Sequence, residues 1–224
     1  MEIQSVGEVI CNEIRRRILE GFYAPGERLN VDELGRVLDT SKTPVREALG
    51  RLESEGLVVF KSRVGWSVSA LTVEEFTDFL EIQFALRLFV SDNLLPHIDT
   101  LDFALLDSIN KEMRHRLEGQ DYFRIIQQND LFHMTIFSIY PNKAMVRRLE
   151  ELDSLIRLQR VRFFEQERTL FPKLAGDAFI QHQNIIEKLK SRDADAIARV
   201  SRDHFASVVG AYQHLSQNTR GKSA

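Results

Sequence analysis

The chain contains the stretch Ser41-Lys42-Thr43-Pro44-Val45-Arg46-Glu47-Ala48-Leu49, in which hydroxyls and cations gather at the expected start of a helix. Apolar residues at Val45, Ala48, Leu49 and Leu52 recur at helical spacing, so they form one inward face. The first turn of a helix offers free backbone N–H groups and the positive end of the helix dipole, and both attract phosphate. The stretch therefore predicts a helix whose N-terminal end meets the DNA backbone.

The segments around this helix predict a winged helix-turn-helix. Apolar residues within 34–38 indicate a short preceding helix, and a break at residues 39–41 separates the two helices. Two expected strands, 57–60 and 66–69, flank residues 61–65, whose two cations and glycine are typical of a hairpin tip, and such a hairpin is a wing. The predicted DNA contacts are Ser41, Lys42, Thr43 and Arg46 at the helix start, Lys61, Arg63 and Gly65 on the wing, and Arg36 and Arg51 as further candidates.

The overall composition is that of an ordinary globular protein. The 224 residues are 43% hydrophobic and carry a formal net charge of −3, so the global charge gives no sign of nucleic-acid binding. Charged residues interrupt the apolar stretches, and the N-terminus lacks the pattern of an export signal, so we expect neither membrane insertion nor export. The single cysteine, Cys11, falls among the apolar positions of the first helix. We expect a cytoplasmic protein in which Cys11 fills the core.

A change in composition near residues 70–72 predicts a second, all-α domain. Glycine is almost absent beyond this point, and apolar residues recur at spacings of three and four. The expected fold is mainly α: a winged helix-turn-helix with a small β-hairpin wing, then an antiparallel bundle of about six helices. The expected bundle helices are 73–95, 101–118, 121–139, 142–166, 172–190 and 193–215. The expected domains are 1–70 for DNA binding, 71–76 as linker, 77–216 for effector binding and dimerisation, and 217–224 as a flexible tail.

Three histidines lie on three separate helices of the expected bundle. Asp193 lies in the turn between the last two helices, eleven residues after His182 and eleven before His204. Residues equidistant from the turn of an antiparallel helix pair lie abreast. Asn129 and His133 are four residues apart and share a face of a third helix. The spacing alone is compatible with a site for Zn²⁺, Ni²⁺ or a similar ion, and equally with ordinary hydrogen-bonded core histidines.

Two motifs, Pro25-Gly26-Glu27-Arg28-Leu29 and the stretch 41–49, make residues 8–69 resemble the winged-helix domain of the GntR family of bacterial transcription regulators. The six later helices and their histidines resemble the ligand-binding domain of the FadR subfamily, called FCD. The resemblance thus covers nearly the whole chain. It implies that the recognition-helix start and the wing bind DNA, at the same residues that the charge pattern indicates.

The resemblance also implies a metal site in the helical domain. Asn129-Asp130-Leu131-Phe132-His133 resembles the family's motif of an aspartate, two residues, a phenylalanine and a histidine, and His182 and His204 match its two later histidines. The predicted ligands of a zinc or nickel ion are therefore Asn129, His133, His182 and His204. Asn129 departs from the family's aspartate. Because a neutral amide is a weaker ligand, we expect either a lower metal affinity or an anionic effector that completes the site.

A second departure concerns the effector. Many relatives carry an arginine and, four residues later, a glutamate on the first bundle helix, where this chain has Gln83 and Arg87. The family's arginine assists carboxylate binding, whereas Gln83 brings no charge, so the effector class stays open. The fourth bundle helix carries several arginines, which are either solvated or, for Arg157 and Arg160, directed inward to an anion. The predicted effector contacts are Gln83, Arg87, Arg157 and Arg160.

A metal-dependent hydrolase is the alternative function, because three histidines with an open coordination position activate water. Against it, no histidine is followed directly by aspartate, the His-Glu-x-x-His motif is absent, and no serine or cysteine has a base at a recognisable spacing. We therefore expect no enzyme. The expected function is a dimeric transcription regulator, a repressor rather than an activator, which binds a palindromic double-stranded operator and responds to a small organic acid or another anion.

Overall fold

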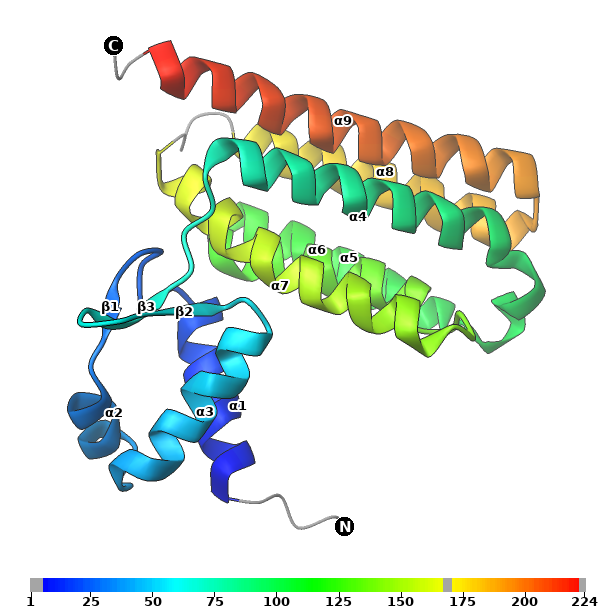
Figure 1. Ribbon diagram of the computed structural model, residues 1–224. Helices are drawn as coiled ribbons and strands as arrows, with labels where there is room; N and C mark the ends of the chain where they lie inside the picture. The colour runs from blue at the N-terminus through cyan, green and yellow to red at the C-terminus, as the bar shows by residue number, and fades with distance from the viewer. Residues whose placement is uncertain (1–5, 167–170, 222–224) are drawn as a thin grey trace. The chain divides into compact units, whose positions relative to one another are not determined.

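The chain divides into two compact units. The first contains the residues up to Leu71 and the short stretch Arg157–Arg162 of a later helix, and the second contains the remaining residues. The structure is a computed structural model that describes residues 6–166 and 171–221 (Figure 1). The described part of the chain is mainly helical with a small sheet in the first unit, so the predicted fold class is confirmed. No helix within these ranges is long and apolar enough to cross a membrane.

Three helices form the core of the first unit. Apolar side chains on α1 and α3 face each other, and Ile14, Ile18, Leu49 and Leu52 are fully buried there. Cys11 is also buried, as its place in the apolar pattern predicted. The three helices are α1 (Val6–Leu19), α2 (Val31–Val37) and α3 (Lys42–Ser54).

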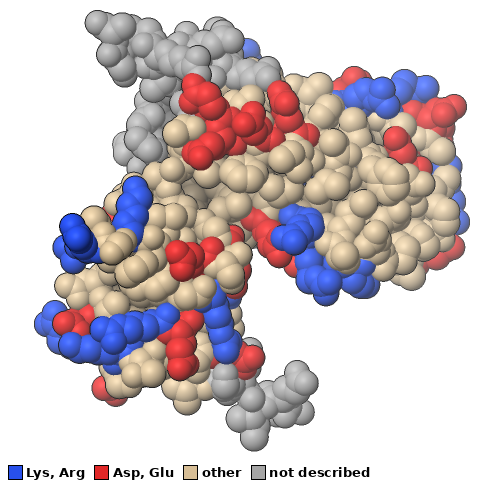
Figure 2. All heavy atoms as spheres, viewed as in Figure 1, with Lys and Arg blue, Asp and Glu red and all other residues tan. Residues whose placement is uncertain are grey.

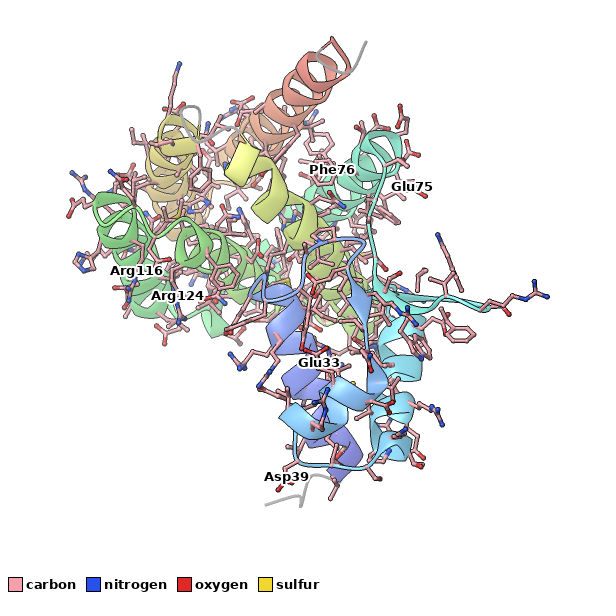
Figure 3. All side chains as sticks on the ribbon, turned by 90° about the vertical axis from the view of Figure 1, so that its left-hand side faces the viewer. Glu33, Asp39, Glu75, Phe76, Arg116 and Arg124 are labelled. Carbon is pink, nitrogen blue, oxygen red and sulfur yellow. The ribbon has the colours of Figure 1, made fainter. Side chains whose placement is uncertain are left out.

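The turn between α2 and α3 is tight. The side chain of Asn30 caps the start of α2, and the N–H of Thr40 donates to the carbonyl of Gly35 at 2.8 Å. A Cβ atom on Gly35 would lie only 3.0 Å from the Thr40 carbonyl oxygen, so this close approach favours a glycine. Asp39 adopts a positive φ of 48° in the turn; Figure 3 labels it together with Glu33 of α2. The start of α3 is thereby held beside the first turn of α2.

The sheet has one more strand than predicted. The expected hairpin consists of β2 (Val58–Lys61) and β3 (Gly65–Val68), and β1 (Arg28–Leu29) pairs with the other edge of β3 in the order β1-β3-β2. All pairings are antiparallel, with Arg28 opposite Ser67 and Leu29 opposite Trp66. A strand of two residues has no alternating pattern, so the sequence contains no sign of it.

Within the described residues, six α-helices build the second unit, as the apolar repeats predicted. α4 packs against α9, α8 packs against α5 and α9, and α5 packs against α6 (Figure 1). A 3-10 helix, η1 (Leu95–Thr100), was not expected, and the last helix ends at 221 instead of 215. The helices are α4 (Val73–Asn93), α5 (Phe103–Glu118), α6 (Tyr122–Phe137), α7 (Lys143–Gln166), α8 (Phe171–Ser191) and α9 (Ala194–Gly221).

The first helix of this unit is anchored at its N-terminus. The Thr72 side chain accepts from the Glu75 N–H while the Glu75 carboxylate accepts from the Thr72 N–H, which is a reciprocal capping box. Phe76 follows and packs edge-on against Tyr212 of α9, with ring centroids 5.2 Å apart; Figure 3 labels Glu75 and Phe76. α4 thus begins inside the range 71–76 that was expected to be a linker.

Polar side chains interrupt the apolar core of the bundle. Burial of a polar group is unfavourable unless it is hydrogen-bonded, so such residues point to a specific role. They come from every helix of the bundle and include three of the six histidines. The buried polar residues of the bundle are Gln83, Arg87, Ser91, Asn110, Asp130, His133, Asp153, His182, Ser201 and His204, and the stretch of α7 that groups with the first unit adds Gln159 and Arg160.

Candidate functional site

The start of α3 presents its predicted DNA contacts to solvent. Ser41 is the N-cap residue, and its side chain makes no capping hydrogen bond to the described first turn. Lys42, Thr43 and Arg46 are exposed on the first turns of the helix. The N–H groups of this turn have no partners within the helix, which is the usual condition of a helix N-terminus. An anion approaching this end meets backbone donors, hydroxyls and cations together.

An exposed carboxylate of α2 lies among these cations. Asp32 Oδ1 is 2.6 Å from Lys42 Nζ. The hydrogen bond from Lys42, together with the charges of Lys42, Arg46 and Arg36, holds the pKa of Asp32 below its ordinary value. Asp32 therefore binds one predicted DNA contact and lies within electrostatic reach of two more. The sequence reasoning missed this acid because it lies on a different helix from Lys42.

The wing carries its predicted cations at the tip of the hairpin. Lys61 and Arg63 are exposed, Arg63 adopts a positive φ of 65°, and Gly65 has a φ of 99°. Arg28 of β1 was missed: its Nε and Nη2 atoms lie 4.0 Å from the point where a Cβ on Gly65 would be. Lys and Arg side chains gather over this unit on the face drawn in Figure 2.

Arg51 is in the last turn of α3, at the opposite end from Lys42.

The three predicted histidines converge inside the bundle. His133 of α6, His182 of α8 and His204 of α9 are each at most 1% exposed. One ring nitrogen of each lies within 4.8 Å of the others, and the Nε2 atoms of His133 and His204 are 3.0 Å apart. The equal spacing around the last turn thus predicted that His182 and His204 come together.

A buried amide orients His182. Asn110 of α5 donates through Nδ2 to the carbonyl of Phe179 at 3.3 Å, which leaves Oδ1 as the acceptor facing His182 Nδ1, also at 3.3 Å. His182 Nδ1 therefore carries the proton, and Nε2 keeps its lone pair. Nε2 is buried and has no hydrogen-bond partner among the described residues. Phe132 stacks on the imidazole with centroids 3.9 Å apart and planes 8° from parallel.

A second amide orients His204 in the same way. Gln181 Oε1 lies 2.6 Å from His204 Nδ1, and Gln181 Nε2 donates to Ser207 Oγ at 3.3 Å. The Nδ1 atom of His204 is thus the donor, and Nε2 faces His133 with its lone pair. A side-chain oxygen on the outer nitrogen is the usual support of a metal-binding histidine, because it fixes the tautomer and the ring orientation. The sequence marks Asn110 as unusual, because it is a polar residue among the apolar positions of α5. Gln181 carries no such mark, because its partner His204 lies on another helix.

The histidine cluster is electrically suited to a cation. Burial lowers the pKa of His182 well below its ordinary value, and the charges of His204 and Arg87 add to the effect. His182 is therefore neutral, as a metal ligand must be. In a tetrahedral zinc site with Zn–N bonds of about 2.0–2.1 Å, two imidazole nitrogens lie about 3.3 Å apart. The observed separation of 3.0 Å between His133 and His204 is close to that value, and His182 offers a third nitrogen within 4.8 Å of theirs, so the residue types and their convergence fit a divalent metal.

The remaining predicted site residues lie in different environments. Asn129 is half-buried on α6, one turn before His133, while its neighbour Asp130 is buried and has interactions of its own. Gln83 and Arg87 are buried on α4 and both donate to Asp153 of α7. Arg157 and Arg160 lie in the stretch of α7 that groups with the first unit. Arg160 is buried and Arg157 is half-buried. Their contact with an effector stays a prediction.

Known proteins share this sequence pattern and this fold. Residues 7–68 match the family described as "Bacterial regulatory proteins, gntR family", and residues 78–207 match the "FCD domain". The chain is 25% identical over 195 residues to the "Uncharacterized HTH-type transcriptional regulator YdhC" of Bacillus subtilis. This match covers 87% of this chain and 85% of YdhC. It is also 26% identical over 227 residues to the "Gluconate operon transcriptional repressor" of Bacillus licheniformis. That match covers 98% of this chain and 91% of the repressor.

A solved structure, "E. coli McbR/YncC", superposes with a TM-score of 0.82 at 20% identity and covers 95% of this chain and 99% of that one. This likeness concerns the fold. The two matched families together span the winged helix-turn-helix, its wing and most of the helical bundle. The chain is therefore a DNA-binding transcription regulator that belongs to the GntR family and carries an FCD domain.

Proposed function

We propose that this regulator is a homodimeric repressor that holds a divalent metal in its helical domain and releases its operator when a small organic acid binds beside the metal. The observation that carries the proposal is the pair of amide oxygens on the outer nitrogens of His182 and His204, which leave both inner nitrogens with lone pairs. Zn²⁺ and Ni²⁺ are the proposed ions, because both accept imidazole ligands.

The proposed ligands are His133, His182, His204 and Asn129. All four bind a metal as neutral groups, so a divalent ion receives no compensating charge from these four ligands. A buried charge of this size favours an anionic partner. This is the reason to propose an acid as the effector, with Arg87 as its second point of contact and Gln83, Arg157 and Arg160 as further candidates.

DNA binding is proposed to use the start of α3 for the major groove and the wing for flanking contacts. The proposed contacts are those predicted from the sequence, with Arg28 added because it lies beside Gly65. A single winged helix reads few base pairs, so two copies related by a two-fold axis would read a palindrome. Movement of the bundle helices by the effector would change the spacing of the two reading helices.

A hydrolase built on the same histidines receives no support. Neither the matched families nor the named relatives are hydrolases. Among the described residues, all three imidazoles are at most 1% exposed. A buried and oriented donor set suits the sensing of a small ligand better than turnover.

Replacement of Arg46 by alanine tests the DNA interface. We expect a loss of about 10- to 100-fold in affinity for an operator duplex selected from random sequences, since Arg46 would contact a base or a phosphate at the helix start. Fluorescence anisotropy at fixed salt measures the affinity. Arg124→Ala removes an exposed cation of α6 in the helical bundle, outside the proposed DNA contacts, and is the matched control that should bind nearly as wild type does. Equal binding by R46A and wild type contradicts the interface.

Replacement of Asp32 by asparagine tests the ion pair with Lys42. Without its partner, Lys42 is free to bind phosphate, so affinity for nonspecific duplex should rise and the log–log salt slope should steepen by about one. Glu33→Gln removes the same charge from the adjacent exposed position of α2 and controls for net charge. An equal response of D32N and E33Q would show that only net charge matters.

Metal content tests the histidine cluster. The protein purified without chelators should contain about one zinc or nickel ion per chain by mass spectrometry of metals, and His182→Ala should lose it. His115→Ala replaces an exposed histidine of α5 and should leave the content unchanged. Asn110→Ala should weaken metal binding by about 10- to 100-fold, while Asn110→Asp restores an acceptor for His182. Retention of metal by H182A excludes the site.

Operator release tests the effector. We expect at least one of acetate, succinate, citrate and gluconate to lower the operator affinity of the metal-loaded protein. Gluconate is included because the name of the B. licheniformis relative refers to a gluconate operon. The same acids should have little effect on the metal-free protein, because the metal supplies the main charge that attracts them. Release that is equal with and without metal contradicts the proposed role of the ion.

A further inference from the structure

A buried ion pair joins two helices of the bundle beside the histidine cluster. Arg87 Nη2 of α4 donates to Asp153 Oδ1 of α7 at 2.6 Å, and the two side chains are only 4% and 3% exposed. Gln83, one turn before Arg87 on the same face of α4, donates to the same oxygen. Both donors of α4 therefore hold one carboxylate of α7.

Stability does not explain such a pair. Desolvation of two charges costs about as much as their attraction returns, and replacement by packed apolar residues is often neutral or stabilising. The surrounding core is apolar and could accommodate such residues, since Phe137 and Phe205 lie next to Arg87. The pair therefore calls for a functional explanation.

The guanidinium lies close to the histidines. Its carbon is 5.7 Å from the centroid of Phe137 and 5.4 Å from that of Phe205. The Phe205 ring is in turn 5.3 Å from the ring of His204 and 5.5 Å from that of His133. Arg87 and the two histidines thus share Phe205 as a neighbour. A small acid bound at the cluster would have a buried cation within reach.

We propose that Asp153 is an internal competitor of the effector: it occupies Arg87 in the acid-free protein, and the carboxylate of a bound acid takes Arg87 from it. The inference rests on the proposed effector site. The exchange is chemically balanced, because one carboxylate replaces another on the same guanidinium. Gln83 remains as a neutral donor to the displaced Asp153, which gives a role to the residue that departs from the family pattern.

The exchange would couple acid binding to the packing of two helices. Arg87–Asp153 is a charged link between α4 and α7, and the exchange would remove this link. α4 is also the helix that begins directly after the DNA-binding unit, at the Thr72 cap. A change in its packing is therefore transmitted along the chain toward that unit. Competition by Asp153 also sets the acid concentration that the protein senses.

Calorimetric titration of the zinc-loaded full chain with citrate and with acetate tests the proposal. Asp153→Asn keeps an oxygen that accepts from Gln83 but removes the competing charge, so at least one acid should bind about tenfold more tightly than to wild type. The acid concentration that releases the selected operator should fall by the same factor. Arg87→Gln combined with D153N should abolish the gain. Asp107→Asn, which removes the partner of Lys190 on the bundle surface, is the matched control and should have no effect.

The outcomes separate this inference from the proposed function. Acid binding that is equal in wild type and D153N overturns the competition and leaves the effector site standing. Absence of acid binding in both proteins overturns the effector site and the competition together. Acid binding by D153N alone supports the competition, because wild type then masks the site. Asp153→Ser is the second variant if circular dichroism shows that D153N does not fold, and the same outcomes apply to it.

Discussion

Polar side chains inside an apolar helical bundle must find hydrogen-bond partners, and this constraint determines the geometry of the histidine cluster. Asn110 and Gln181 satisfy the outer nitrogens of His182 and His204, so the inner nitrogens face the centre of the cluster, where His204 Nε2 meets His133 Nε2. The stacked ring of Phe132 and the close packing of Phe205 keep the imidazoles from rotating. The same burial keeps His182 neutral, because the cost of desolvation lowers its pKa. One physical requirement therefore produces both the orientation and the charge state of the donors.

The two units use charge in opposite ways. The DNA-binding unit displays cations in water, where each contact with phosphate is weak and salt-dependent and several must act together. The bundle encloses a few charges in an apolar core, where each interaction is strong and an unmatched charge is costly. A ligand that alters the balance of buried charge therefore has a large effect on the packing of helices. This difference suits one unit to reading DNA and the other to sensing a small ion.

An internal carboxylate lies beside the cations in each unit. Asp32 holds Lys42 at the start of α3, and Asp153 holds Arg87 beside the histidines. In both places the acid occupies a cation that is proposed to bind an external anion, phosphate in one case and an organic acid in the other. The exposed pair costs little to separate, since solvent screens both partners, whereas separation of the buried pair leaves charges without solvent, and for this reason we propose that another anion replaces Asp153. Such acids reduce affinity for the anion and set the threshold for binding.

Much of this protein was predictable because its patterns are local. The helical repeats, the cations at 41–46 and the even spacing of His182 and His204 around Asp193 are set by the order of residues, so the winged helix-turn-helix, the bundle and the histidine cluster follow from the sequence. Strand β1 is too short to leave a pattern. The partners Asp32, Asn110 and Asp153 each meet their cation or imidazole from a different helix, 10 to 72 positions away along the chain. Only the tertiary structure decides such contacts, because they depend on how helix faces pack and not on any spacing within one helix.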